Sequence, residues 1–384
     1  MKNHILFSVF FKTCVLLLIS MTAMAASPVF EPSHADNPLK NIIQITPGTN
    51  TDFFAPKTVD IDGDGDLDVM LVSSSGVLYF VKNSSQSATS FSFTDDPQAV
   101  ALSGLSTNYF SAGFINISGT DLPDMFISEN LSNTLRYFEN TSAEGNIQFT
   151  ENSSANPFNG KNLAFYNIDD STFNFGFRMA FADMDDDGDK DIIFGVKTAK
   201  YTNRLIYYEN TGGNNFEEGL SNPFSCVSSN DFPAPDLADI DGDGDYDLVV
   251  GSSRQIKYYE NTGTKYHAQF VPKDSEDNCL SDDNAYHCEV TPASSSDEYY
   301  CPAFADFDGD GTYALLVGFR DDSEFQYWSI AKAVLPGDIN GKDGISLSDA
   351  ILGLKILADA DTFGDTVNLA ADVDTNQKIG LEEV

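Results

Sequence analysis

A short aspartate-rich segment recurs five times along this chain, and it constrains the fold more than any other feature. In chain order the copies are DIDGDGDLD (60–68), NISGTDLPD (116–124), DMDDDGDKD (183–191), DIDGDGDYD (239–247) and DFDGDGTYA (306–314). We number them loop 1 to loop 5 and count positions from the first residue of each loop. The loops start roughly 55 to 67 residues apart, a period typical of propellers and solenoids.

The residues that follow each loop repeat as well. First comes an apolar run that suits a strand buried on both faces: DVMLV, DMFIS, DIIFG, DLVVG and ALLVG. An aromatic strand and a polar turn come next, as in LYFVKNSS, LRYFENTS, LIYYENTG and IKYYENTG. A fourth strand is expected to start near Phe91, Phe149, Phe216 and Phe270. Four short antiparallel strands per repeat predict an all-β fold, a β-propeller of about five four-stranded blades; an open array is the alternative.

The last repeat lacks its fourth strand, because it ends near Ser329. The N-terminal sequence VFEP followed by NPL resembles FEE followed by NPF, and FTE followed by NPF, in two complete repeats. We therefore expect residues 28–50 to supply the outer strand of the last blade. Such a closure joins the two ends of the ring and protects strand edges.

The strong loops carry carboxylates at alternate positions, with a glycine at position 6 that permits a sharp turn. Such a loop brings oxygen ligands together around one centre, and Ca²⁺ prefers six to eight of them. Without a cation, two carboxylates about 5 Å apart repel by roughly 0.8 kcal/mol in water. Zinc is disfavoured because neither His nor Cys lies near the loops, and magnesium keeps more of its water. Three near-identical copies favour calcium over a merely solvated acidic turn.

The candidate ligands lie in four of the five loops, because loop 2 carries too little charge and is expected to bind no metal. In loops 1, 3 and 4 they are Asp60, Asp62, Asp64, Asp66 and Asp68; Asp183, Asp185, Asp187, Asp189 and Asp191; and Asp239, Asp241, Asp243, Asp245 and Asp247. Loop 5 offers Asp306, Asp308 and Asp310 and lacks the final carboxylate.

The D-x-D-x-D-G-x-x-D loop, followed by an apolar strand and a YYENTG-like turn, resembles the FG-GAP/VCBS repeat over about residues 52–330. That unit builds the integrin α-subunit propeller and many bacterial exported proteins. The resemblance implies that calcium rigidifies one rim of the propeller in a structural role. It also implies that a protein or glycan ligand binds through variable loops elsewhere.

The N-terminus indicates export. Residues 1–25 combine Lys2 and Lys12 with an apolar run and the small-residue pattern around Ala25, so cleavage is expected there. No later segment is long enough to span a membrane. The mature chain is therefore expected to be secreted, periplasmic or at the cell surface.

Charge and cysteine content narrow the partners and the covalent links. A net charge of -38 disfavours nucleic acid, because phosphate binding needs clustered Lys and Arg. Four cysteines follow the expected cleavage site, and they allow three pairings. We favour Cys279–Cys288 and Cys226–Cys301.

Residues 28–335 thus form the expected propeller, and residues 336–384 a separate module. Two loops with a helical stretch between them (350–357) resemble a type I dockerin, a small α-helical EF-hand module that binds cohesins. Its candidate ligands are Asp338, Asn340 and Asp349, then Asp372, Asp374, Asn376 and Glu383. Lys342 stands at a ligand position of the first loop, and the second loop ends close to Val384. A cohesin-like partner is implied by the resemblance alone.

The sequence contains no G-x-S-x-G, no H-E-x-x-H and no glycine-rich phosphate loop beside a lysine. We therefore expect a non-enzymatic binding or adhesion module. The alternative is a hydrolase or lyase that acts on polysaccharide and is docked to a larger assembly, because paired carboxylates are abundant here. The repeat aromatics Tyr207, Tyr208, Tyr258 and Tyr259 are expected to pack between sheets rather than to stack on sugars.

Overall fold

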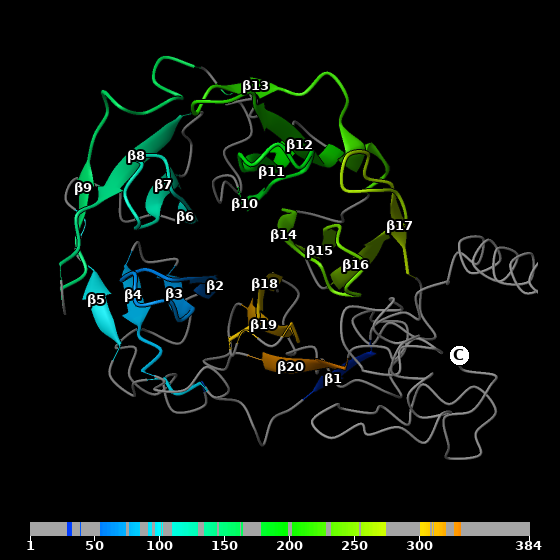
Figure 1. The fold of residues 1–384 in the computed structure, drawn as a ribbon, viewed down its shortest axis with the longest axis horizontal. Helices are drawn as coiled ribbons and strands as arrows, with labels where there is room; N and C mark the ends of the chain where they lie inside the picture. Colours follow the sequence, from blue (N-terminus) through cyan, green and yellow to red (C-terminus); the bar gives the residue numbers. More distant parts are fainter. Residues whose placement is uncertain are drawn as a thin grey trace, which may run out of the picture. The chain divides into compact units, whose positions relative to one another are not determined.

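The expected repeats are present as five antiparallel sheets of four strands each, which we call blades 1 to 5 (Figure 1). Blade 1 contains β2 (Phe54–Val59), β3 (Asp68–Ser73), β4 (Leu78–Val81) and β5 (Gln98–Val100). Blade 2 contains β6 (Phe110–Ile115), β7 (Asp124–Glu129), β8 (Leu135–Asn140) and β9 (Phe149–Glu151). Blade 3 contains β10 (Arg178–Ala182), β11 (Asp191–Thr198), β12 (Thr202–Asn210) and β13 (Phe216–Glu218). Blade 4 contains β14 (Ala234–Ala238), β15 (Asp247–Ser252), β16 (Gln255–Asn261) and β17 (Phe270–Pro272). Blade 5 contains β18 (Tyr300–Ala305), β19 (Ala314–Phe319), β20 (Gln326–Ala331) and β1 (Val29–Pro32).

The computed structural model describes residues 29–32, 39, 54–73, 77–84, 91–93, 97–100, 102, 110–129, 134–143, 146–161, 163, 178–198, 202–227, 232–252, 255–273, 300–307, 309, 311–319 and 326–331. All of them lie in Pro28–Lys332, one of the two units into which the chain divides. The expected export signal and the dockerin-like module lie outside the described residues. Within the described part of the chain, no helix has the length and apolar character needed to cross a membrane.

The last blade is closed by the N-terminal strand, as the sequence predicted. β1 pairs antiparallel with β20, and Phe30 lies opposite Ile330. The sheet order β1-β20-β19-β18 therefore combines the two ends of the described chain in one blade. Phe30 is buried and its ring meets Tyr258 of blade 4 edge-on, with centroids 5.6 Å apart. This closure removes the open edge that a three-stranded blade would leave.

Every aspartate loop is the hairpin between the first and second strand of its blade. The residue before each loop pairs with position 9, as in Val59 opposite Asp68 and Ala238 opposite Asp247. Even the weakest copy keeps this register, because Ile115 lies opposite Asp124. The matched register places all five loops at the same end of their blades.

The apolar run after each loop is buried on both faces, as expected for a central strand. In β3, Met70 and Val72 pack in the cluster between blades 1 and 2, whereas Val69 and Leu71 pack in the cluster between blades 5 and 1. Alternation of side chains across a strand explains this division. Similar clusters join blades 2 and 3, 3 and 4, and 4 and 5, so five interfaces close the ring.

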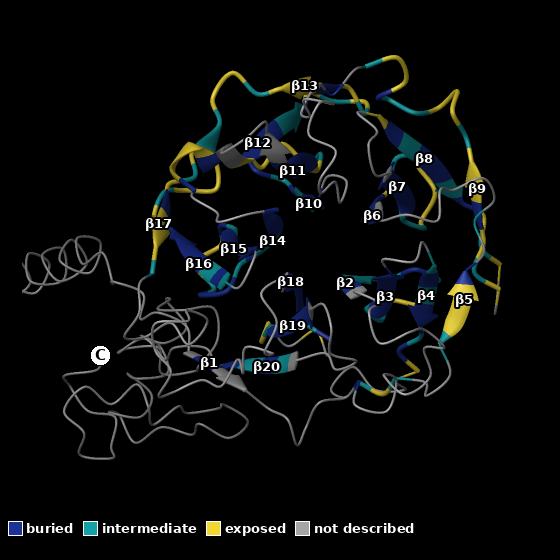
Figure 2. Ribbon diagram, turned by 180° about the vertical axis from the view of Figure 1, so that it is seen from behind, coloured by how far each residue is buried: buried dark blue, intermediate teal, exposed yellow. Residues whose placement is uncertain are grey.

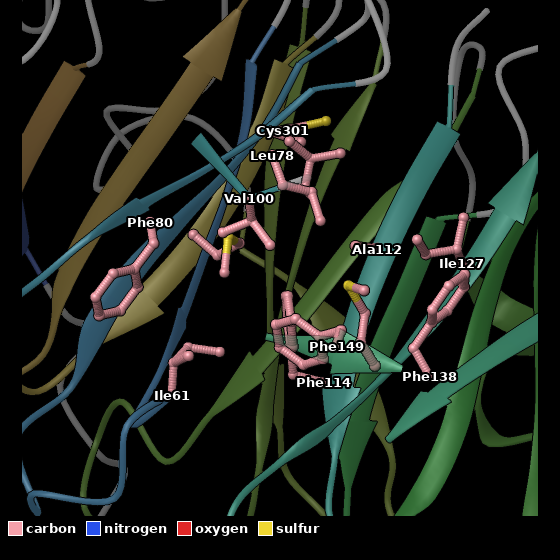
Figure 3. Close-up of a cluster of buried hydrophobic side chains, with 14 of the residues drawn as sticks. Ile61, Leu78, Phe80, Val100, Ala112, Phe114, Ile127, Phe138, Phe149 and Cys301 are labelled. Atoms are coloured by element: carbon pink, nitrogen blue, oxygen red, sulfur yellow. The ribbon is translucent and has the colours of Figure 1, made fainter. Parts of the chain in front are cut away.

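Figure 3 shows the cluster between blades 1 and 2, where Leu78 and Phe80 of blade 1 accompany Phe114, Ile127 and Phe138 of blade 2. Burial decreases outward within blades 1 to 4 (Figure 2). The inner and middle strands are mostly buried, whereas outer strands such as β9 and β13 expose two of their three residues. The core of this propeller therefore lies between neighbouring blades.

Blade 1 departs from the expected strand pattern. Its outer strand, β5, begins at Gln98 rather than near Phe91. The Phe91 and Phe93 rings instead lie 5.3 and 5.1 Å from the Phe307 ring of blade 5, measured between centroids. The aromatic pair therefore serves the contact between blades 5 and 1. The other expected starts, at Phe149, Phe216 and Phe270, are confirmed.

The expected Cys226–Cys301 disulfide is wrong for this structure. Both thiols are free, with Cys226 exposed and Cys301 buried. Cys301 lies in β18 among the apolar side chains of a core cluster, whereas the Cys226 sulfur lies 3.3 Å from the Phe270 carbonyl oxygen near the outer strand of blade 4. Cys301 thus lies in the inner strand of its blade, whereas Cys226 lies beside the outer strand of another blade. Cys279 and Cys288 lie outside the described residues.

Candidate metal sites

Three of the aspartate loops bring carboxylates close enough to share one cation. The groups are Asp60, Asp62 and Asp68 in loop 1; Asp183, Asp185 and Asp187 in loop 3; and Asp239, Asp241 and Asp243 in loop 4. Within each group, one oxygen per residue lies within 4.8 Å of the others. Among the residues that the structure describes, the three loops with the strongest sequence pattern are thus the ones that form carboxylate clusters.

The backbone of each loop is shaped by its glycines and by the carboxylate at position 1. Gly65, Gly188 and Gly244, all at position 6, have φ of 95°, 96° and 95°, a region that suits glycine. In loop 4, the Asp239 carboxylate accepts hydrogen bonds from the Gly242 and Gly244 amides at 2.8 and 3.1 Å. Asp60 and Asp183 accept equivalent bonds in their loops. Position 1 therefore holds the turn closed. In loops 3 and 4 the carboxylates at positions 3 and 5 cluster with that of position 1, whereas in loop 1 the clustered carboxylates are those at positions 1, 3 and 9.

The residues present fit a hard divalent cation. Each of the three loops buries one carboxylate oxygen that has no hydrogen-bond partner: Oδ1 of Asp62, of Asp185 and of Asp245. Burial, reinforced by the neighbouring Asp243 and Asp241 carboxylates, raises the pKa of Asp245 to about 7. Burial and the Asp243 carboxylate likewise raise the pKa of Asp241 to about 6. Buried oxygens without partners and mutually repelling carboxylates are the features that a bound cation would relieve.

The carboxylate at position 9 has a structural role that the sequence did not reveal. Asp247 is 1% exposed, and it accepts hydrogen bonds from the Ile240 amide (3.3 Å), the Asn261 amide (2.8 Å) and the Tyr258 hydroxyl (2.8 Å). Burial raises its pKa to about 8. The carboxylate thereby ties the start of loop 4 to the end of the third strand.

The same anchor recurs in blades 1, 2 and 3. Asp68, Asp124 and Asp191 are 0% exposed, and each accepts a bond from the amide of position 2 and from the amide of an asparagine at or just after the end of the third strand. Those asparagines are Asn83, Asn140 and Asn210, and their side chains donate in turn to the carbonyl of position 8. The recurring Asn of the ENTG turn is the sequence signal for this role, in addition to turn formation.

Loop 2 keeps the hairpin without clustered charge. Asn116 accepts a bond from the Gly119 amide, and Ser118 Oγ lies 3.1 Å from both Thr120 Oγ1 and Asp124 Oδ1. Neutral hydroxyl and amide groups satisfy one another where the other loops place carboxylates. In loop 5, Asp306 accepts from the Gly311 amide, and Ala314 replaces the buried anchor. Asp308 and Asp310 lie outside the described residues, as do the ligands predicted for the dockerin-like module.

Loop 1 differs from loops 3 and 4 in having a lysine at its carboxylates. The Lys82 ammonium, just after β4, lies 2.7 Å from Asp64 Oδ2 and also pairs with Asp62. Burial opposes its charge, but the hydrogen bonds that the ammonium donates to Asp62 and Asp64 prevail and raise the pKa of Lys82 well above its ordinary value. The three clusters are therefore not electrostatically equivalent.

The loop end of the central channel holds a cavity of about 400 Å³. Its wall includes position 8 of four loops, which are Leu67, Lys190, Tyr246 and Tyr313. These side chains differ from repeat to repeat, whereas positions 1 and 6 are nearly constant. The variable residues of the repeat therefore gather at one cavity.

Charged side chains on the inner strands line the same cavity and link blades. Lys57 of blade 1 donates to the Met179 carbonyl of blade 3 at 2.9 Å, and Asp236 of blade 4 accepts from the Phe304 amide of blade 5 at 2.7 Å. Burial raises the pKa of Asp236, although Lys57 acts in the opposite direction. Thr58 adds a 2.6 Å bond to the Phe304 carbonyl. These bonds satisfy backbone groups on strand edges that have no further strand beside them.

The repeat tyrosines pack between sheets, as predicted. Tyr207, Tyr258 and Tyr259 are 7%, 1% and 1% exposed, and Tyr208 is partly buried. Tyr207 and Tyr258 also donate to the anchor carboxylates Asp191 and Asp247. They are not available for sugar stacking at the surface.

Comparison with known proteins agrees with the repeat assignment. A model of the FG-GAP-like repeat matches residues 183–250, which run from loop 3 to the second strand of blade 4. No curated protein sequence matches the chain. Among solved structures, one that resembles it is an Agrocybe aegerita lectin, described for its specific recognition of non-reducing terminal N-acetylglucosamine. The lectin is 15% identical with a TM-score of 0.36, and the match covers 71% of this chain and 65% of the lectin chain. The FG-GAP-like repeat is thus supported for residues 183–250, and the five-bladed propeller is the fold of the described residues.

Proposed function

We propose that this protein is an exported, non-enzymatic binding module in which calcium holds the blade loops rigid. The observation that carries this proposal is the set of three carboxylate clusters, together with a buried carboxylate oxygen that lacks a hydrogen-bond partner in each of the same three loops. The first ligand of each calcium site would be the carboxylate at position 1, which is Asp60, Asp183 or Asp239. The carboxylates at positions 3 and 5 would be further ligands. Oxygen-only ligands in a tight glycine-containing loop suit Ca²⁺ better than zinc.

Calcium would act on stability rather than on chemistry. A cation that binds the native state alone stabilises it by mass action, by about 2.7 kcal/mol per site at a hundredfold excess over Kd. The loops join the first two strands of each blade, so rigid loops hold the ends of the inner strands in place. This role requires no reactive group, in keeping with the absence of a catalytic motif from the sequence.

We place the ligand at the cavity on the loop end of the channel. Its lining combines two lysines, two aspartates and two tyrosines, which are Lys57, Lys190, Asp236, Asp306, Tyr246 and Tyr313. Such a mixed polar and aromatic surface suits a polar ligand, a glycan or a protein segment, held by hydrogen bonds and ring contacts. Export through residues 1–25 and attachment through the dockerin-like tail complete the proposal. The tail would connect the module to a cohesin-like partner.

A glycan panel tests the binding part of this proposal. The purified chain is expected to retain a subset of glycans without cleaving them, and Lys190→Ala, an exposed cavity residue, is expected to weaken retention. Lys265→Ala is the matched control, because Lys265 is also exposed but pairs with Asp186 outside the cavity. Bond cleavage would support the polysaccharide hydrolase or lyase instead. An equal loss of glycan retention in both variants would contradict ligand binding at the cavity.

Thermal unfolding with calcium and with a chelator tests the metal part. We expect calcium to raise Tm, and we expect the double variant Asp185→Asn with Asp241→Asn to lose most of that increase. The matched control is Asn116→Ala with Ser118→Ala in loop 2, which should leave the calcium response unchanged. If calcium still raises the Tm of the Asp185→Asn, Asp241→Asn variant as much as that of wild type, the blade loops are not the calcium sites.

A further inference from the structure

The position just before the anchor asparagine differs in charge between blades. It is Lys82 in blade 1 and Glu139, Glu209 and Glu260 in blades 2, 3 and 4. The alignment rests on the structure as well as the sequence, because the asparagine that follows each of these residues donates its amide to the position 9 carboxylate. Lys82 is therefore the equivalent of the three glutamates, with the opposite charge.

The Lys82 ammonium lies where a cation would bridge positions 3 and 5 of loop 1. It pairs with Asp62 and, at 2.7 Å, with Asp64. The Lys82 side chain is 35% exposed and that of Asp62 is 16% exposed, so the pair is partly shielded from water. A partly shielded ion pair is screened less than one at the surface.

Loops 3 and 4 lack such an ammonium at the matching carboxylates. Within the described ranges, no lysine or arginine pairs with Asp185, Asp187, Asp241 or Asp243. Lys265 pairs with Asp186 at position 4 of loop 3, whose side chain is exposed. In blade 4, the nearby Glu260 adds negative charge that acts on Asp241, and its own partner is Lys273.

We propose that Lys82 is a built-in counterion that takes the place of calcium in loop 1, so that calcium binds loops 3 and 4 in preference to loop 1. This inference rests on the proposed calcium function and refines it. Calcium can enter loop 1 only by displacing an ammonium from Asp62 and Asp64, and the displaced charge stays close to the ion. Repulsion between neighbouring cations is expected to weaken binding by about tenfold or more.

Loops 1 to 4 are then of two kinds. Loop 1 is closed by a lysine and loop 2 by neutral hydrogen bonds, so blades 1 and 2 keep their loops without metal. Loops 3 and 4 depend on calcium, and they belong to adjacent blades. The loss of calcium should loosen this one side of the propeller rather than the whole ring.

Reciprocal charge exchange in the full-length chain tests the proposal. Lys82→Glu gives blade 1 the residue of the other blades, and Glu209→Lys gives blade 3 a lysine at the matching position. Equilibrium dialysis with radioactive calcium counts the bound ions for each protein. We expect Lys82→Glu to bind one more tight calcium than wild type and Glu209→Lys to bind one fewer. Because each variant is compared with wild type, any calcium bound by the C-terminal module cancels in the difference.

Hydrogen exchange at the Gly63, Asp64 and Gly65 amides provides a second, local readout. In wild type, calcium at a concentration that saturates loops 3 and 4 should leave these amides unchanged, and in Lys82→Glu it should protect them. An unchanged calcium count in Lys82→Glu, or equal protection of loops 1, 3 and 4 in wild type, would overturn the role of Lys82 alone. Binding of no calcium by the loops of any variant would overturn the proposed calcium function as well.

Discussion

Replacement of Asp247 by alanine separates the two roles that carboxylates have in these loops. Asp247 is buried and accepts three hydrogen bonds, whereas Asp243 at position 5 is exposed and belongs to the carboxylate cluster. If position 9 anchors the loop, Asp247→Ala should destabilise the protein whether or not calcium is present. Asp243→Ala should destabilise it only when calcium is present.

The size of the effect follows from the groups left without a partner. The Ile240 amide, the Asn261 amide and the Tyr258 hydroxyl all lose their acceptor. A lost hydrogen bond costs about 1 kcal/mol net, and more where a buried donor is left unsatisfied. Removal of a carboxyl group whose ionisation is disfavoured by burial offsets part of this loss. We therefore expect about 3 kcal/mol, which corresponds to a decrease in Tm of roughly 5 °C for a domain of this size.

Calorimetry of both variants in chelator and in calcium provides the measurement, with Tyr258→Phe as a further control. Tyr258→Phe alone should cost about 1 kcal/mol, and it should add nothing to Asp247→Ala, because the two share one hydrogen bond. A Tm of Asp247→Ala within about 1 °C of wild type in chelator would refute the anchor. A deficit that appears only with calcium would make Asp247 a ligand instead.

Three more predictions follow from other parts of the propeller. Without calcium, stability should fall as pH rises from about 4 to 8: burial raises the folded pKa of Asp241, Asp245 and Asp247 to about 6, 7 and 8, so the native state binds more protons than the unfolded state. Calorimetry at pH 5 and 8 in chelator measures the sign of this pH dependence, and a higher Tm at pH 8 would contradict these shifts. Calcium should reduce the difference in Tm between the two pH values, because it binds the ionised carboxylates. Gly251→Ala should cost about 2 kcal/mol in urea unfolding, because a Cβ there would lie 2.3 Å from the Tyr300 carbonyl oxygen of the next blade. Phe30→Ala should cost about 3 kcal/mol in the same assay, because Phe30 is 1% exposed in the strand that closes blade 5, and a smaller loss than that of the exposed Leu220→Ala would argue against closure.

The blade number and the closure were predictable because they depend on patterns that every copy shares. An apolar run after each loop has a single reading as a strand buried on both faces, and five copies therefore predict five blades. The resemblance of VFEP and NPL to the FEE and NPF of complete repeats located the missing strand. Local sequence was sufficient to locate this strand, because only the outer strand of the last repeat was missing.

The details that depend on contacts between blades were not predictable. Phe91 has the spacing of an outer strand, but its ring packs on Phe307, more than two hundred residues away in sequence. The Cys226–Cys301 pairing failed because chain order does not reveal that one cysteine is in an inner strand and the other beside an outer strand. The role of Lys82 was hidden for a similar reason, because it stands 18 residues after Asp64 and meets it only across the sheet.

The most direct measurement of the central idea is a crystal structure of the full-length chain grown with calcium, with anomalous data that identify the ion. Peaks are predicted between positions 1, 3 and 5 of loops 3 and 4, near Asp185 and Asp241, with the Lys82 ammonium still on Asp62 and Asp64 in loop 1. Ordered loops 3 and 4 that hold only water at millimolar calcium would contradict the account.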